Sequence, residues 1–309
     1  MPYTIEKIAK LIGAERIGDT EARIDWILTD SRSLCFPEET LFFALLTRRN
    51  DGHKYIGELY NRGVRNFVIS ELLSELESYK DCNFLKVANP LKALQKLAEY
   101  RREEFQIPVI GITGSNGKTI VKEWLYQLVS PDRTVTRSPR SYNSQIGVPL
   151  SVWLMNEESQ LAIFEAGISE MGEMDALRNI IKPTIGILTN IGGAHQENFF
   201  SLQDKCLEKL SLFKDCDVII YNGDDELISS CVSKSILTAR EIAWSLKDDE
   251  KPLFIKSIKK GETETVIEYR YLGMDNSYRI SFIDDASIEN SLNCLAACLY
   301  LMIDPQIIA

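Results

Sequence analysis

Residues 107–119 have the sequence Ile-Pro-Val-Ile-Gly-Ile-Thr-Gly-Ser-Asn-Gly-Lys-Thr, and this stretch decides the fold. An apolar run typical of a buried strand ends in a glycine-rich turn that closes with Lys118 and Thr119. Gly114 and Gly117 allow the backbone to turn tightly, so that several N–H groups converge on one anion at the start of the next helix. The sequence therefore predicts a strand, a phosphate-binding loop and a helix, in that order.

The residues of this loop are expected to bind different parts of a phosphate ligand and its metal. In such a loop the lysine reaches the outer phosphates and the hydroxyl binds Mg²⁺. The apolar residues that follow recur at helical spacing, which supports the predicted helix over a glycine-rich turn with a chance Lys-Thr pair. Ile112 stands where the general pattern has its first glycine. The residues expected to bind the phosphates are Gly114, Ser115, Asn116, Gly117, Lys118 and Thr119.

Composition limits the class of protein. The 309 residues suit two domains, and the hydrophobic and charged fractions of 45% and 26% are typical of a soluble globular chain. The net charge of −10 argues against a nucleic-acid partner. With no apolar run of membrane-spanning length and no leader-like start, we expect a cytoplasmic protein without membrane contact. The seven scattered cysteines lack a Cys-x-x-Cys pair, so we expect reduced thiols and no zinc site.

The chain changes character near Gln106. Residues 1–105 alternate short apolar strands with helical patterns, which predicts a small α/β domain. Residues 106–309 carry longer apolar strands separated by helices, which favours a mostly parallel sheet covered on both faces. Within them, Val266–Tyr271 and Tyr278–Phe282 alternate around Gly273, which predicts an appended antiparallel hairpin.

Polar residues follow two further strands of the predicted sheet, at the edge where ligands bind in such folds. Glu165 follows the strand 161–164 and suits a Mg²⁺ ligand or a simple surface acid. His195 ends the small-residue loop 189–195 and suits either a ligand or a structural histidine. Lys205 and Lys209 lie four apart on a predicted helix over 201–213, and their spacing favours a solvated helix face.

With these segments the chain resembles the Mur ligases. Among them it resembles the branch that adds D-alanyl-D-alanine to UDP-N-acetylmuramoyl-tripeptide in peptidoglycan synthesis. The segments that carry the resemblance are Thr113–Thr119, Tyr142–Leu150, Glu165 with Ala166-Gly167, and Thr189–His195. The resemblance implies an ATP- and Mg²⁺-dependent carboxylate–amine ligase that forms ADP through an acyl phosphate.

The resemblance also implies roles for single residues. Lys118, Asn143, His195 and Lys209 would be catalytic, with Asn143 beside the γ-phosphate and the acceptor. Thr119 and Glu165 would hold one Mg²⁺, and His195 with a carbamylated Lys209 would hold a second. Asn290, and with it Asn293, resembles the family's asparagine motif on the nucleotide side, although Glu289 stands where the family usually has histidine.

In the first domain, Thr29–Arg32, Leu41–Leu45 and Asp51–His53 resemble a UDP-binding signature. The resemblance makes Ser31 and Arg32 the candidate substrate-binding residues of a UDP-muramoyl-peptide-binding domain, 1–105, followed by an ATP-binding domain, 106–309. Family members carry a C-terminal third domain that brings the amine. We therefore expect this chain to be a fragment that does not complete the ligation alone. A parent chain fused to an alanine racemase is a further expectation, and the partners are small-molecule substrates.

Three alternatives stay open. A folylpolyglutamate-synthase-like ligase shares the loop but carries it near its start, whereas a whole domain precedes it here. A MurE-type ligase, which adds a single amino acid, shares the first-domain signature. A non-catalytic nucleotide-binding module would not need Glu165, His195 and Lys209 together.

Overall fold

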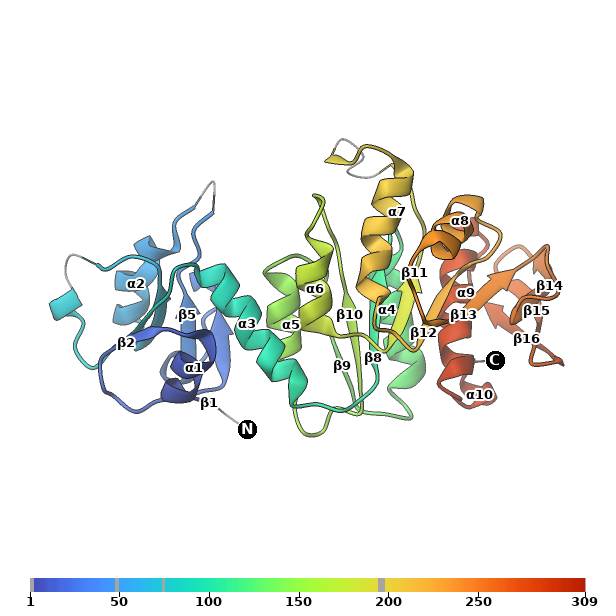
Figure 1. Cartoon of the computed structure of the whole chain (residues 1–309). Coiled ribbons are helices and arrows are strands. Elements are labelled where there is room, and N and C mark those ends of the chain that lie inside the picture. Colours follow the sequence, from blue (N-terminus) through green and yellow to red (C-terminus); the bar gives the residue numbers. More distant parts are fainter. Residues whose placement is uncertain (1–2, 48–49, 74–75, 194–197, 309) are drawn as a thin grey trace. The chain divides into compact units, whose positions relative to one another are not determined.

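The computed structural model describes residues 3–47, 50–73, 76–193 and 198–308. The chain divides into two compact units, each with its own sheet (Figure 1). The first unit comprises Met1–Phe105 with Val152–Glu157, and the second comprises Gln106–Ser151 with Glu158–Ala309.

The first unit is built on a five-stranded sheet in the order β2-β7-β6-β5-β4. All neighbouring strands are parallel except β2 and β7, and β1 pairs with β3 in a separate antiparallel ribbon. Its core combines aliphatic side chains with buried aromatic rings, and the ring centroids of the stacked Phe67 and Phe84 lie 5.3 Å apart. The strands are β1 (Tyr3–Thr4), β2 (Glu15–Ile17), β3 (Arg23–Ile24), β4 (Trp26–Leu28), β5 (Thr40–Phe43), β6 (Asn66–Ile69) and β7 (Asn83–Lys86).

The helices of this unit follow their capping signals. Thr4 caps the first helix and Asn89 caps the last, in each case by accepting from a backbone N–H in the first turn. They are α1 (Ile5–Ile12), α2 (Ile56–Asn61) and α3 (Pro90–Glu103), with 3₁₀ turns η1 (Ser31–Ser33), η2 (Pro37–Glu39), η3 (Gly52–Tyr55) and η4 (Leu76–Ser78).

The second unit contains a nine-stranded sheet in the order β16-β15-β14-β13-β12-β11-β8-β10-β9. From β14 to β9 in this order, neighbouring strands are parallel. At the other end of the sheet, β15 is antiparallel to both β14 and β16. The strands are β8 (Val109–Thr113), β9 (Val135–Arg137), β10 (Leu161–Glu165), β11 (Ile185–Leu188), β12 (Val218–Asn222), β13 (Arg240–Ser245), β14 (Leu253–Lys260), β15 (Thr265–Tyr271) and β16 (Met274–Ile280).

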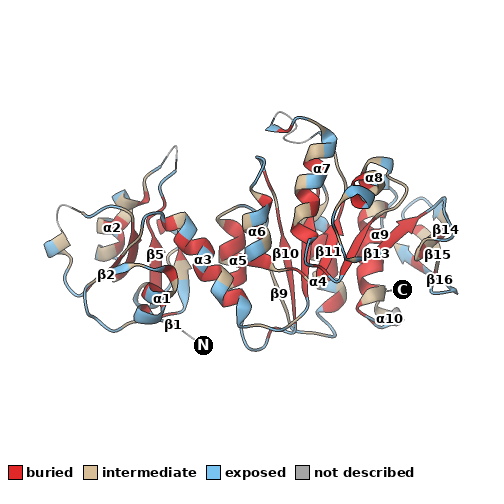
Figure 2. Ribbon diagram, in the orientation of Figure 1, coloured by how far each residue is buried: buried red, intermediate tan, exposed pale blue. Residues whose placement is uncertain are grey.

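Helices cover this sheet, and the central strands are buried along their whole length (Figure 2). Helices α4 and α9 pack against each other, while η6 contacts β8 and β11. Continuous apolar strands need such cover on both faces, which explains why their sequences do not alternate. The helical segments are α4 (Lys118–Val129), α5 (Gly147–Trp153), α6 (Met174–Ile181), α7 (Leu202–Leu210), η6 (Ser211–Phe213), α8 (Glu226–Lys234), α9 (Asp285–Tyr300) and α10 (Pro305–Ile308).

The predicted fold class is confirmed: an α/β chain with a mostly parallel sheet and an appended antiparallel hairpin. The hairpin turns at Leu272 and Gly273, whose φ angles of 50° and 80° are both left-handed, as the favoured two-residue hairpin turn requires. The structure adds β14, which makes the antiparallel part three-stranded. The predicted helix over 201–213 is shorter, because α7 ends at Leu210 and a 3₁₀ turn follows.

Parallel pairing decides where polar groups gather. In the pairing of β10 with β8, Glu165 lies opposite Ile112, and in that of β11 with β8, Leu188 lies opposite Thr113. The loops that follow these three strands therefore leave the sheet at one edge. In the described part of the chain, no helix combines the length and the apolar character that crossing a bilayer requires.

Candidate functional site

The loop after β8 has the tight backbone that its glycines allow. Gly114 and Gly117 have φ angles of 147° and 82°. A Cβ atom on Gly114 would lie 1.9 Å from Thr189 Oγ1, and one on Gly117 would lie 2.3 Å from Asn290 Oδ1. Glycine is therefore required at both positions by conformation and by space.

Asn190 anchors the first half of the loop. The Ser115 N–H donates to the Asn190 carbonyl at 2.8 Å, and the Asn116 N–H donates to Asn190 Oδ1 at 3.0 Å. These two amides are therefore engaged within the protein. The amides of Gly117, Lys118 and Thr119 belong to the N-terminus of α4, where N–H groups have no intrahelical partner and the helix dipole favours an anion. The set of amides that could bind an anion, those of Gly117, Lys118 and Thr119, is thus smaller than the sequence predicts.

Three lysines gather around this loop. Lys118 Nζ donates to the carbonyls of Gly114 at 2.8 Å and Ser115 at 3.2 Å. Lys209 Nζ donates to the same Gly114 carbonyl at 3.1 Å, and Lys205 Nζ donates to the Gly192 carbonyl at 2.6 Å. These three side chains line one pocket, together with Gly114, Ser115, Asn143, Ser144, Gly167, Ile168 and Ser169. The pocket is cationic and suits an anionic ligand.

The prediction that Lys205 and Lys209 lie on a solvated face of α7 is wrong. Lys205 and Lys209 are both buried, because this side of the helix faces the phosphate loop. Burial, together with the charges of Lys118 and Lys205, lowers the pKa of Lys209 to about 7. Burial also lowers the pKa of Lys118, while the Glu165 carboxylate opposes that shift. Lys209 therefore has a substantial neutral fraction near pH 7.

Glu165 lies at the end of β10 and is completely buried. Its Oε2 atom accepts from Thr119 Oγ1 at 3.1 Å and from Asn143 Nδ2 at 3.3 Å. Its Oε1 atom lies 3.0 Å from the ammonium of Lys122, which is also completely buried. The interpretation of Glu165 as a surface acid is therefore wrong. The structure brings Thr119, Asn143 and Glu165 together, and it adds Lys122, which the sequence analysis did not single out.

The two asparagines of α9 have different surroundings. Asn290 is the residue whose Oδ1 lies beside Gly117, at the phosphate loop. Asn293 is fully buried, and its Oδ1 accepts from Trp244 Nε1 at 3.0 Å. Asn290 thus belongs to the loop region and Asn293 to the core. His195 lies outside the described residues.

Ser31 and Arg32 belong to the first unit. Ser31 is buried and its carbonyl accepts from Arg62 Nη1 at 2.7 Å. Arg32 is exposed and pairs with Asp30 at 2.6 Å. The Asp30 side chain also accepts from the Arg32 N–H, so the pair holds the turn η1 in shape.

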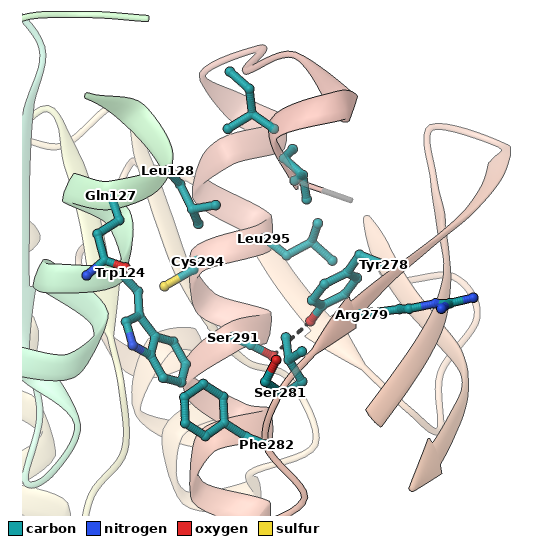
Figure 3. A pocket seen from close by; sticks show the side chains of 13 residues that line it. Trp124, Gln127, Leu128, Tyr278, Arg279, Ser281, Phe282, Ser291, Cys294 and Leu295 are labelled. Atoms are coloured by element: carbon teal, nitrogen blue, oxygen red, sulfur yellow. Dashed lines mark hydrogen bonds between the residues drawn. The ribbon is translucent and has the colours of Figure 1, made fainter. Parts of the chain in front are cut away.

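The second unit has another pocket, which lies between α4, β16 and α9 (Figure 3). In its lining, Trp124 and Phe282 stack with ring centroids 5.0 Å apart, and the hydroxyls of Tyr278 and Ser291 lie 2.9 Å apart. Most of its other lining is apolar, including Leu128, Leu295, Ile307 and Ile308. Phosphate groups are therefore better matched by the lysine pocket at Gly114.

Comparison with known proteins identifies the family of this chain. The family model for the Mur ligase middle domain matches residues 112–298, more than half of the chain. The UDP-N-acetylmuramoyl-tripeptide–D-alanyl-D-alanine ligase of Borreliella burgdorferi is 32% identical over 305 residues, which cover 96% of this chain and 64% of that protein. The chain thus spans less than two thirds of that relative's length.

Solved structures share the fold. A crystal structure of MurF from Acinetobacter baumannii superposes with a TM-score of 0.88 at 24% identity, covering 100% of this chain and 67% of that one. MurF from Thermotoga maritima in complex with ADP superposes with a TM-score of 0.79 at 22% identity, covering 92% and 65%.

Proposed function

Since the chain belongs to the Mur ligase family, we propose that its second unit is the ATP-binding part of an ATP-dependent ligase. The proposed ligase joins D-alanyl-D-alanine to the peptide carboxylate of UDP-N-acetylmuramoyl-tripeptide in peptidoglycan synthesis. The observation that carries the proposal is the convergence of Lys118, Lys205 and Lys209 on a phosphate loop whose Thr119 contacts the buried Glu165. The name of the Borreliella relative supports the choice of substrates, and the ADP complex of the Thermotoga protein supports the nucleotide.

The chemistry needs a cationic, well-ordered site. A carboxylate is a poor electrophile, so ATP first phosphorylates it: a carboxylate oxygen bonds to the γ-phosphorus and ADP leaves. The amine then attacks the acyl carbon, inorganic phosphate leaves, and the amine loses a proton. The first step brings two anions together, so alignment and charge neutralisation matter more than covalent help.

The described residues meet this need as follows. The amides of Gly117, Lys118 and Thr119 would bind the phosphates, and the Lys118 ammonium would neutralise the β- and γ-oxygens. Asn143 lines the lysine pocket and donates to Glu165 at 3.3 Å, so it would orient groups between the γ-phosphate and the acceptor. Asn290, beside Gly117, would contact the nucleotide from α9.

Thr119 and Glu165 fit a Mg²⁺ ion. A hydroxyl and a carboxylate oxygen, 3.1 Å apart, are the hard oxygen ligands that Mg²⁺ prefers, and the ion takes its remaining ligands from phosphates and water. Among the described residues no group of three or more His, Cys, Asp or Glu is placed to hold a metal by itself, which agrees with a site completed by the nucleotide. When bound, Mg²⁺ supplies positive charge at the transferring phosphoryl group.

Lys209 is proposed to act as a carbamate. A neutral amine attacks CO₂, a nitrogen–carbon bond forms, and one proton is released to solvent. Lys209 has the lowered pKa that this reaction needs, and it lies beside two other cations that would stabilise the resulting anion. The carbamate and His195 would then hold a second Mg²⁺ on the acceptor side.

The first unit is proposed to bind the UDP part of the acceptor, with Ser31 and Arg32 as contacts. The division of labour between residues 1–105 and 106–309 is part of this proposal. A cytoplasmic site of action, where ATP is available, is a further part. Fusion of the parent chain to an alanine racemase stays a prediction.

Phosphate release tests the proposal. The full-length protein is incubated with ATP, UDP-N-acetylmuramoyl-tripeptide and D-alanyl-D-alanine, beside Lys118→Ala, Lys209→Ala and the control Lys214→Ala, an exposed lysine of the same unit. We expect release that needs both substrates, is lost in the first two variants and is kept in the third. Release with UDP-N-acetylmuramoyl-dipeptide and a single amino acid would favour the MurE-type alternative. ATP consumption that no acceptor stimulates would favour a non-catalytic module.

A further inference from the structure

Lys122 has surroundings that the proposed chemistry does not yet explain. It lies on α4, one turn after Lys118, and is among the largest side chains that are completely buried. A buried ammonium ion is costly unless charges and hydrogen bonds surround it. Lys122 Nζ donates to the carbonyls of Ser138, at 2.9 Å, and Arg140, and it lies 3.0 Å from carboxylate oxygens of both Glu123 and Glu165.

The two carboxylate oxygens of Glu165 have different partners. Oε1 lies 3.0 Å from Lys122 Nζ and makes no hydrogen bond, so this contact is an ion pair without a directed N–H···O bond. Oε2 accepts from Thr119 and Asn143, which belong to the phosphate loop and the lysine pocket. Lys122 therefore lies on the protein side of the carboxylate and leaves the other oxygen facing the site.

The same ammonium joins two parts of the chain that surround the site. The carbonyls of Ser138 and Arg140 lie in the segment between β9 and α5, and this segment continues to Ser141 and Asn143. Ser138 Oγ in turn accepts from the Glu165 N–H at 3.3 Å. Helix α4, the end of β10 and the Asn143 segment thus meet at one buried positive charge.

We propose that Lys122 is a positioning residue that orients Glu165 for the divalent cation of the nucleotide complex. Its ammonium compensates the buried carboxylate on Oε1 and directs Oε2 toward Thr119, so the cation meets an ordered ligand. This inference rests on the proposed function, because it assumes that Thr119 and Glu165 hold the cation. Partners of metal ligands typically change metal affinity by about 10- to 100-fold when they are removed.

The experiment measures Mn²⁺ binding by electron paramagnetic resonance in the presence of ADP, without any acceptor substrate. Lys122→Met is compared with the wild type, with Glu165→Gln and with the double variant. We expect Lys122→Met to weaken Mn²⁺ binding by about 10-fold or more. In the Glu165→Gln background we expect the same substitution to change Mn²⁺ affinity less than about 2-fold, because the carboxylate it acts through is gone.

A matched control separates this effect from general damage. Glu123→Gln removes the other carboxylate on Lys122 and leaves Glu165 intact, so we expect wild-type Mn²⁺ affinity. If Lys122→Met alone does not fold, the comparison of Glu165→Gln with the double variant carries the test, since the double variant buries neither charge of the pair. Equal Mn²⁺ affinity of these two supports the proposal, and a further 10-fold loss contradicts it.

The outcomes also distinguish this proposal from the ligase assignment. Unchanged Mn²⁺ affinity in a folded Lys122→Met variant would overturn the role of Lys122 whatever the ligase assay shows. A full-length protein that binds Mn²⁺ and ADP but releases no phosphate with the acceptor substrates would overturn the proposed function and leave the role of Lys122 standing.

Discussion

Thr119 Oγ1 donates to Glu165 Oε2 across 3.1 Å, and this bond joins the phosphate loop to the end of a neighbouring strand. The two residues are 46 positions apart in the chain, and the parallel pairing of β8 with β10 brings them together. A hydroxyl and a carboxylate in this relationship would supply two oxygen ligands to the proposed Mg²⁺ site.

Removing the hydroxyl is expected to weaken the metal–nucleotide complex. Thr119→Val keeps the shape of the side chain and loses the oxygen, so we expect ADP affinity in the presence of Mg²⁺ to fall by about 10- to 100-fold. Isothermal titration calorimetry measures it. Thr119→Ser, which keeps a hydroxyl, should stay within about 3-fold of the wild type. Equal loss in both variants would show that the hydroxyl is not the important group.

Gly117 is expected to be irreplaceable because of its neighbour as well as its backbone. Gly117→Ala would place a Cβ 2.3 Å from Asn290 Oδ1, whereas Gly172, with a nearly identical φ of 83°, has open space around it. Left-handed strain alone costs about 1 kcal/mol, so Gly172→Ala should show that loss. Gly117→Ala should lose more, together with ADP binding. Urea unfolding checks the difference, and equal losses would contradict it.

The lowered pKa of Lys209 predicts a pH-dependent stability. The native pKa is about 7 and the unfolded value is about 10.4, so between them the unfolded chain holds one more proton than the native chain. The free energy of unfolding should therefore rise with pH, by roughly 2 kcal/mol between pH 7 and 9.

Urea unfolding of the wild type and two variants, in buffer free of bicarbonate, isolates this contribution. Lys209→Met should lack this part of the rise, and Lys214→Met, at an exposed lysine, should keep it. Parallel pH profiles for the wild type and Lys209→Met would show that Lys209 is not titrating in this range.

The two asparagines of α9 should separate stability from binding. Asn293→Ala removes the acceptor of the buried Trp244 N–H and should lower the free energy of unfolding by about 1–3 kcal/mol. Asn290→Ala should mainly reduce ADP affinity, since its oxygen lies at the loop. Thermal unfolding and titration calorimetry on both variants check this. Loss of stability in Asn290→Ala and loss of ADP affinity in Asn293→Ala would show that the two roles are the other way round.

The loop and its sheet could be predicted from sequence because the signals are local. An apolar run, two glycines and a Lys-Thr pair specify the strand, turn and helix over residues 107–129, and the alternation near Gly273 specifies the hairpin. These patterns depend on residues a few positions apart. The secondary structure that these patterns specify therefore depends little on the rest of the fold.

Burial of charge could not be predicted in the same way. The spacing of Lys205 and Lys209 is equally typical of a solvated helix face, and only the packing of α7 near Gly114 decides otherwise. Lys122 carried a usable signal, since it follows Lys118 by one helical turn. The different surroundings of Asn290 and Asn293 also depend on distant residues: Gly117 for Asn290, and Trp244, 49 positions away, for Asn293.

A crystal structure of the chain with ADP and Mn²⁺ would show where the nucleotide binds and, through the anomalous signal of Mn²⁺, where the metal binds. We expect the β-phosphate on the amides of Gly117, Lys118 and Thr119, with one Mn²⁺ peak in contact with Thr119 Oγ1 and the Glu165 carboxylate. Nucleotide bound elsewhere, or a Mn²⁺ peak that touches neither residue, would show that this loop and this pair do not form the ATP site.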